Sequence, residues 1–199
     1  VDMMDLDLIV GSGGVLSHAP RREQSAKMLI DSFLPEGITS LAVDSIFMMP
    51  QLGVMANIEN KEIAEQARVA ALEVFEKDCL IRLGTCIAPV GKLSGSEIPL
   101  QVNLEFKNGE KKDIEVRYGE LIRIEAEYEE IKAVLTPAKG VDVGAGDGEQ
   151  ISTTIFGGQV GIVFDGRGRP LEIDASSSKR ISNLKKWSEA MNEYPEIGK

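Results

Sequence analysis

The sequence predicts an α+β protein in three parts. These are an α/β segment over residues 1–78, an antiparallel β-barrel or sandwich over 79–175 and a C-terminal helix over 176–199. The first part opens with an apolar run, a glycine-rich turn and apolar residues at helical spacing, which is typical of α/β structure. The second part alternates apolar and polar residues, the period of half-buried strands. The third part returns to helical spacing.

Within the first part, the apolar residues Leu6, Leu8, Ile9 and Val10 predict a strand. A helix is expected from about Glu23 to the chain breakers Pro35 and Gly37, and residues 41–49 predict a second strand. Apolar residues define the buried faces of two expected helices: Ala26, Leu29, Ile30 and Phe33 in the first, and Ile63, Ala67, Ala70, Ala71 and Val74 in the second.

In the second part, Val102 and Leu104 alternate with polar residues before the dipeptide Asn108–Gly109, after which the alternation resumes. This pattern predicts a β-hairpin. Further strands are expected over residues 122–124, 131–135, 151–155, 160–164 and 171–173. The final helix has an apolar stripe at Ile181, Leu184, Trp187 and Met191. This stripe either docks onto the body of the protein or binds a partner.

Composition and charge exclude several classes of function. The formal net charge of −10 argues against nucleic acid as a partner, because a general nucleic-acid binder needs a basic face. We expect no membrane partner and a cytoplasmic location, since no apolar run approaches the roughly 20 residues of a membrane span. Cys79 and Cys86 lack a zinc or redox spacing, and His18 is the only histidine. The sequence therefore predicts no metal site and no catalytic residue.

The strongest candidate for a binding site is the turn at Gly11, Ser12, Gly13 and Gly14, followed by Val15. A glycine turn between a strand and a helix brings backbone amides close to a nucleotide. The same turn can also serve only to redirect the chain, and the sequence leaves both interpretations open.

Four arginines are further candidates for contacts with an anion or a partner. Arg21 and Arg22 follow the glycine turn and add positive charge near it. Arg167 and Arg169 lie on a predicted hairpin tip. Two guanidinium groups at such a tip are suited to a phosphate or a carboxylate.

Five segments of the chain, among them IVGSGGVLSHAPRR at 9–22, resemble the glutamate mutase accessory protein family, MutL or GlmL. They are residues 9–22, 44–54, 78–91, 140–146 and 157–173. The resemblance implies an actin/Hsp70-like ATPase lobe and an ATP-dependent, chaperone-like factor that reactivates an adenosylcobalamin-dependent mutase. Carried over to this chain, the turn at 11–14 would contact adenosine, with Val15 opening the next segment.

The chain departs from the family pattern because the Asp-x-Gly-Ser/Thr phosphate loop has no counterpart in it. We therefore expect a C-terminal half, in agreement with a first residue other than Met. The expected partners are mutase subunits and the missing N-terminal ATPase half. ATP or ADP with Mg²⁺ would bind the full-length protein, whereas no cofactor is expected to bind this chain tightly and no ATP hydrolysis is expected from it alone. Two alternatives remain, a nucleotide-independent interaction module and a hydantoinase-like hydrolase.

Overall fold

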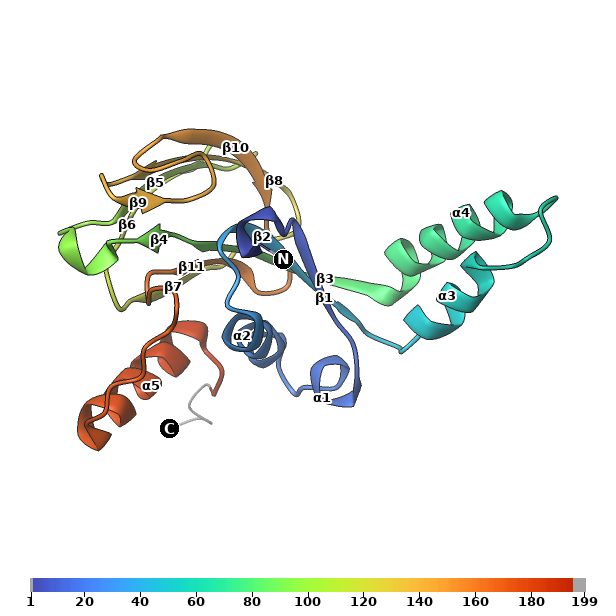
Figure 1. Cartoon of the computed structure of the whole chain (residues 1–199), viewed down its shortest axis with the longest axis horizontal. Helices are drawn as coiled ribbons and strands as arrows, with labels where there is room; N and C mark the ends of the chain where they lie inside the picture. The colour runs from blue at the N-terminus through green and yellow to red at the C-terminus, as the bar shows by residue number, and fades with distance from the viewer. Residues whose placement is uncertain (1, 195–199) are drawn as a thin grey trace.

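A five-stranded mixed sheet forms the centre of the computed structural model, which describes residues 2–194 (Figure 1). In spatial order its strands are β1 (Leu8–Gly11), β2 (Gly37–Asp44), β3 (Leu80–Ala88), β11 (Gly161–Asp165) and β7 (Leu121–Ile124). The pairs β1–β2 and β3–β11 are parallel, and the other two pairs are antiparallel. Strands from both sides of residue 79 thus share one sheet. Residue 1 and residues 195–199 of the predicted final segment lie outside the described residues.

A four-stranded antiparallel sheet covers one face of the mixed sheet. Its order is β10 (Ile151–Phe156), β8 (Glu130–Pro137), β5 (Leu100–Glu105) and β6 (Lys111–Val116). Leu104 and Leu135 of this sheet share a core with Ile87 and Phe164 of the mixed sheet. A short ladder joins β4 (Val90–Gly91) to β9 (Val141–Asp142). The strands of residues 80–165 therefore form layers, and the expected barrel is wrong because β3 and β11 pair within the mixed sheet instead of closing the antiparallel one.

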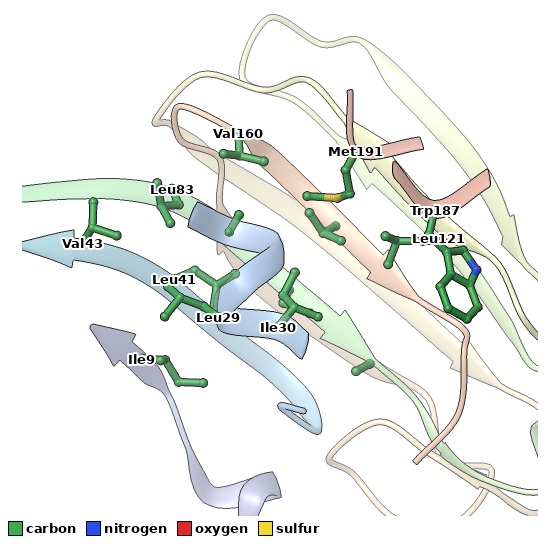
Figure 2. Packing of buried hydrophobic residues seen from close by; sticks show 14 residues of the cluster. Ile9, Leu29, Ile30, Leu41, Val43, Leu83, Leu121, Val160, Trp187 and Met191 are labelled. Carbon is green, nitrogen blue, oxygen red and sulfur yellow. The ribbon is translucent and has the colours of Figure 1, made fainter. Parts of the chain in front are cut away.

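Two helices cover the opposite face of the mixed sheet. They are α2 (Arg22–Phe33) and α5 (Ser177–Met191). Leu29 and Ile30 of α2 pack on the sheet, and Trp187 and Met191 of α5 join the same core (Figure 2). The predicted final helix and its docking through Trp187 are confirmed. Ile181 and Leu184 remain 52% and 44% exposed, so only the C-terminal part of the expected stripe is buried.

A helical hairpin projects away from the sheets (Figure 1). It comprises α3 (Met49–Ala56), α4 (Ala64–Val74) and a π-helical turn, η2 (Phe75–Cys79). The strand expected over 41–49 is wrong in its second half, because β2 ends at Asp44 and Pro50 occupies the first turn of α3. Proline is suited to the first turn of a helix, because a backbone N–H at that position would have no acceptor within the helix. Several apolar side chains of the hairpin are exposed: Val54, Ile58, Ile63, Val69, Leu72 and Val74.

The predicted hairpin of the antiparallel sheet is confirmed, since β5 pairs with β6 around a turn in which Gly109 has a φ of +85°. The strand expected over 171–173 is wrong, because these residues leave the sheet through a turn that contains Pro170, which has no N–H to donate to a ladder. Short one-turn helices complete the description: η1 (Met3–Asp5), α1 (Gly14–Ser17) and η3 (Leu93–Gly95). Within residues 2–194, every helix is too short or too polar to cross a bilayer.

Candidate functional site

The glycine turn lies at the carboxyl ends of two parallel strands. Gly11 ends β1 and stands opposite Val43 of β2, one residue before the end of that strand. The chain then passes through Ser12 and Gly13 into α1. In α/β sheets, ligands bind in the crevice beyond the carboxyl ends of parallel strands. The predicted strand and turn are present, but Gly14 opens the one-turn helix α1, and the predicted helix is α2, which begins at Arg22.

The turn is packed on its inner side and open on its outer side. A side chain at Gly11 would meet Leu16 and Leu29 at 2.8 and 2.9 Å, so glycine allows α2 to approach the strand closely. Gly13 has a φ of +109°, and a Cβ there would have no neighbouring heavy atom within 4 Å. Val15 is 73% exposed. A ligand could therefore reach the backbone at Gly13 without displacing protein atoms.

Asp44 is a site residue that the sequence analysis did not single out. Its carboxylate is fully buried and accepts a hydrogen bond from the Ser12 hydroxyl at 3.3 Å. The same carboxylate accepts the backbone N–H groups of Met48 and Met49, at 3.3 and 3.0 Å, where α3 begins. The Ser17 hydroxyl donates to the backbone carbonyl of Asp44. Asp44 thus joins the glycine turn to the projecting hairpin. The sequence feature that could have identified Asp44 is its position as an acidic residue at the end of an apolar strand.

The charged residues after the turn have local partners. Arg22 donates to the backbone carbonyl of Ser17 at 2.9 Å and so holds the end of α1. Arg21 forms an ion pair with Glu23 at 3.1 Å. The ring of His18 lies 5.5 Å from that of Phe47, between centroids.

Arg167 and Arg169 form ion pairs with carboxylates of the same chain. The prediction that they lie on a solvent-facing hairpin tip, where they could bind an external anion, is therefore corrected. Both guanidinium groups are buried and contact Asp165 at 2.8 Å, and Arg167 also contacts Asp31 at 2.8 Å. Arg167 lies over the ring of Trp187, 5.0 Å from its centroid. Burial opposes ionisation of Asp165, but the hydrogen bonds and charges of the two arginines outweigh it and lower the pKa of Asp165. These arginines therefore join the sheet to α2 and α5.

The principal hollows of the described surface are lined by residues other than the glycine turn. The glycine turn thus lies on an open part of the surface, outside these hollows. Among residues 2–194, no three His, Cys, Asp or Glu side chains are grouped so that they could hold a metal. Cys79 and Cys86 are both buried free thiols, and burial raises their pKa values.

The structure defines a mixed α+β protein with a strand, glycine turn and helix at one edge of its central sheet. Residues 1–74 match the model of the family described as MutL protein. The match covers the glycine turn, Asp44 and the α3–α4 hairpin, and over these residues it supports the predicted resemblance to the glutamate mutase accessory family MutL/GlmL. It indicates an accessory role to glutamate mutase. No curated protein and no solved structure matches the chain at a significant level.

Proposed function

We propose that the protein supplies the adenosine-binding wall of an ATP-dependent factor that reactivates an adenosylcobalamin-dependent mutase. One observation carries this proposal. The glycine turn lies at the carboxyl ends of parallel β1 and β2, and its outer side at Gly13 is open. The turn also lies within the residues that match the accessory family. A bare backbone at this place permits a ribose or purine to approach closely.

The hydrogen bonds of Asp44 support a link between the glycine turn and the α3–α4 hairpin. The Ser12 hydroxyl donates a hydrogen bond to the Asp44 carboxylate, and this carboxylate also accepts the first N–H groups of α3. A ligand that contacts Ser12 is therefore connected to the start of α3 through Asp44. Binding shifts a conformational equilibrium only where the ligand prefers one state. In this proposal the nucleotide favours one orientation of the hairpin, and the hairpin transmits that preference to the mutase.

The described residues fit the adenosine side of a nucleotide better than its phosphate side. Phosphoryl transfer depends on Mg²⁺ and cationic groups around the phosphates. In residues 2–194, Arg21, Arg167 and Arg169 are engaged in ion pairs with internal carboxylates, and acidic side chains are not grouped as metal ligands. We therefore assign the phosphates and Mg²⁺ to the N-terminal ATPase half, and propose that this chain alone does not hydrolyse ATP.

We place the protein partner, a subunit of the mutase, on the α3–α4 hairpin. Its exposed apolar side chains, such as Val54 and Leu72, lie on an element that projects from the sheets (Figure 1). Exposed apolar patches of this kind mark surfaces that associate with other proteins. The nucleotide-independent interaction module, the rival to this proposal, would use the same surface without ADP.

Calorimetric titration of ADP into the full-length natural protein tests the proposal. Gly13→Asp should abolish binding, because a carboxylate would occupy the open side of the turn. Gly109→Asp is the matched control, since Gly109 also has a positive φ and open space around it but lies in a distant hairpin. ADP binding that survives in Gly13→Asp contradicts the proposed site. Mutase binding without any ADP binding supports the rival module.

A further inference from the structure

Two hollows of the surface meet at one pair of side chains, Arg82 and Tyr128, and the glycine turn lines neither hollow. The larger has a volume of 460 Å³ and the smaller of 260 Å³. Arg82 of β3 and Tyr128 of the β7–β8 connection line both of them. Ligand sites are concave and combine apolar surface with a few convergent polar groups. The Arg82–Tyr128 hollow has that character.

Arg82 is the cation of this hollow. Its guanidinium carbon lies 5.2 Å from the centroid of the Tyr128 ring. Within residues 2–194, no carboxylate oxygen lies within 4.0 Å of its nitrogen atoms, unlike the paired Arg21, Arg167 and Arg169. A guanidinium resting on an aromatic ring keeps its planar donors free for a carboxylate or a phosphate. Arg82 is therefore placed to hold an anionic group.

Tyr128 supplies an aromatic surface next to that cation. Its side chain is 54% exposed, and its ring stacks on Phe156 with 5.5 Å between centroids and 26° between planes. Leu8, which is 43% exposed, extends the apolar wall of the smaller hollow. An apolar group of a ligand would replace water on these surfaces.

The backbone keeps part of the hollow clear of side chains. Gly84 and Gly157 line the smaller hollow, and Gly158 lines the larger one. A Cβ at any of the three would collide with backbone atoms of neighbouring segments, among them the carbonyl groups of Gly161 and Glu127. Only glycine fits at these positions, because the backbone segments next to the hollow pack closely on one another.

Charges around the hollow decide which class of anion it accepts. Glu76 and Glu127 line the larger part and Asp7 the smaller part, and none of them forms an ion pair within residues 2–194. Three carboxylates around one guanidinium disfavour a polyanion such as a nucleoside triphosphate. A ligand with one negative and one positive group satisfies both kinds of charge.

We propose that the Arg82–Tyr128 hollow binds a small zwitterion of the α-amino-acid class. The carboxylate of the ligand pairs with Arg82, and its ammonium group faces Glu127 and Glu76. An apolar side chain of the ligand packs on Tyr128 and Leu8. None of the residues that line this site belongs to the glycine turn, and its ligand is recognised without contact to a nucleotide.

Three matched probes test the proposal on the full chain: L-phenylalanine, 2-phenylethylamine, which lacks the carboxylate, and 3-phenylpropionate, which lacks the ammonium group. Binding is followed through the backbone amide signals of Gly158 and Gln159 by NMR. L-phenylalanine should bind at least about tenfold more tightly than either single-charge probe, because each lacks one charge-assisted contact. Arg82→Gln should weaken L-phenylalanine and 3-phenylpropionate but leave 2-phenylethylamine unchanged.

Arg117→Gln is the control for Arg82→Gln, since Arg117 is exposed and pairs with Glu115 away from the hollow. Tyr128→Leu should weaken all three probes, whereas Tyr118→Leu, which changes a tyrosine of similar exposure, should not. Equal binding of the three probes would contradict recognition of a zwitterion. So would unchanged L-phenylalanine binding in a folded Arg82→Gln variant, displacement of the probes by millimolar inorganic phosphate, or no binding of any probe.

Discussion

The hydroxyl of Ser12 donates to the carboxylate of Asp44 across 3.3 Å, although the two residues lie 32 positions apart in the sequence. Their proximity follows from the parallel pairing of β1 and β2, which brings the carboxyl ends of both strands to one edge of the sheet. The Asp44 carboxylate also accepts two N–H groups at the start of α3. One buried carboxylate thus fixes both the candidate site and the base of the projecting hairpin.

Replacing Asp44 should destabilise the protein and loosen the hairpin. Asp44→Ala removes the acceptor for the first N–H groups of α3, and such losses cost about 1–2 kcal/mol. Urea denaturation followed by circular dichroism measures the free energy of unfolding. Hydrogen exchange should show faster exchange at the amides of Met48 and Met49.

Asp174→Ala is the control for this variant, because the exposed Asp174 carboxylate accepts one N–H group, from Ser176, near the start of α5. It should change the free energy of unfolding by less than about 0.5 kcal/mol. Equal effects of the two substitutions would mean that Asp44 does not connect the turn and the hairpin.

The buried pairs of Asp165 should make stability depend on pH. Arg167 and Arg169 lower the pKa of Asp165 in the folded protein below the unfolded value of about 3.9. A depressed folded pKa means that this stabilisation is present above about pH 4 and is lost as the pH falls toward the folded pKa. Asp165→Asn should cost about 3 kcal/mol at pH 7, because it leaves buried arginine charges without their main partner.

The pH dependence is measured as the difference in free energy of unfolding between the natural protein and Asp165→Asn from pH 7 to pH 3. The difference should stay constant down to about pH 4 and shrink below it. A difference that grows on acidification would contradict the account. Asp113→Asn is the control, because the Asp113 carboxylate is exposed and accepts a hydrogen bond from Asn103. If Asp165→Asn does not fold at pH 7, the free energy of unfolding of the natural protein should still fall below pH 4. The difference between the natural protein and Asp113→Asn should change much less over the same pH range.

Docking of α5 should depend on Trp187. Its indole N–H donates to the backbone carbonyl of Gly119 at 2.8 Å, and its ring lies against Arg167. Truncating a buried tryptophan costs about 3–5 kcal/mol, so Trp187→Ala should detach the helix or unfold the protein. Leu184→Ala, on the exposed side of the same helix, should cost less than about 1 kcal/mol. Limited proteolysis between β11 and α5 reports the detachment.

Two glycines should respond to alanine in opposite directions. Gly84 has a φ of +137°, and a Cβ there would collide with the backbone of Gly161, so Gly84→Ala should cost several kcal/mol, more than about 3. Gly53 lies within α3 with open space around it, so Gly53→Ala should stabilise the protein by about 0.5–1 kcal/mol. Thermal unfolding ranks both against the natural protein. A tolerated Gly84→Ala would contradict the described contact between β3 and β11.

Local patterns predicted the parts of the fold that local forces determine. Val102 and Leu104 are buried between exposed Gln101 and Asn103, as their alternation indicates. Asn108–Gly109 forms the expected turn. The helix that begins at Arg22 ends at Phe33, and its cap residue Leu34 has a left-handed conformation, close to the predicted breakers. In each case the signal and the structure lie within a few residues of one another.

Pairings between distant segments could not be predicted in this way. Residue periodicity shows that β2 and β3 are strands but not that they pair and so join both halves of the chain in one sheet. Arg167 and Arg169 had the signature of a surface turn, and only the fold shows that Asp165 and Asp31 enclose them. The glycine turn was recognisable, whereas its partner Asp44 depends on the strand register.

Calorimetric titration of ADP into the full-length natural protein, compared with its Gly13→Asp variant, tests most directly whether the glycine turn forms the adenosine wall. The account predicts binding by the natural protein, none by Gly13→Asp and undiminished binding by Gly109→Asp. Equal ADP affinity in all three proteins would contradict it, because the open backbone at Gly13 would then contribute nothing to the nucleotide site.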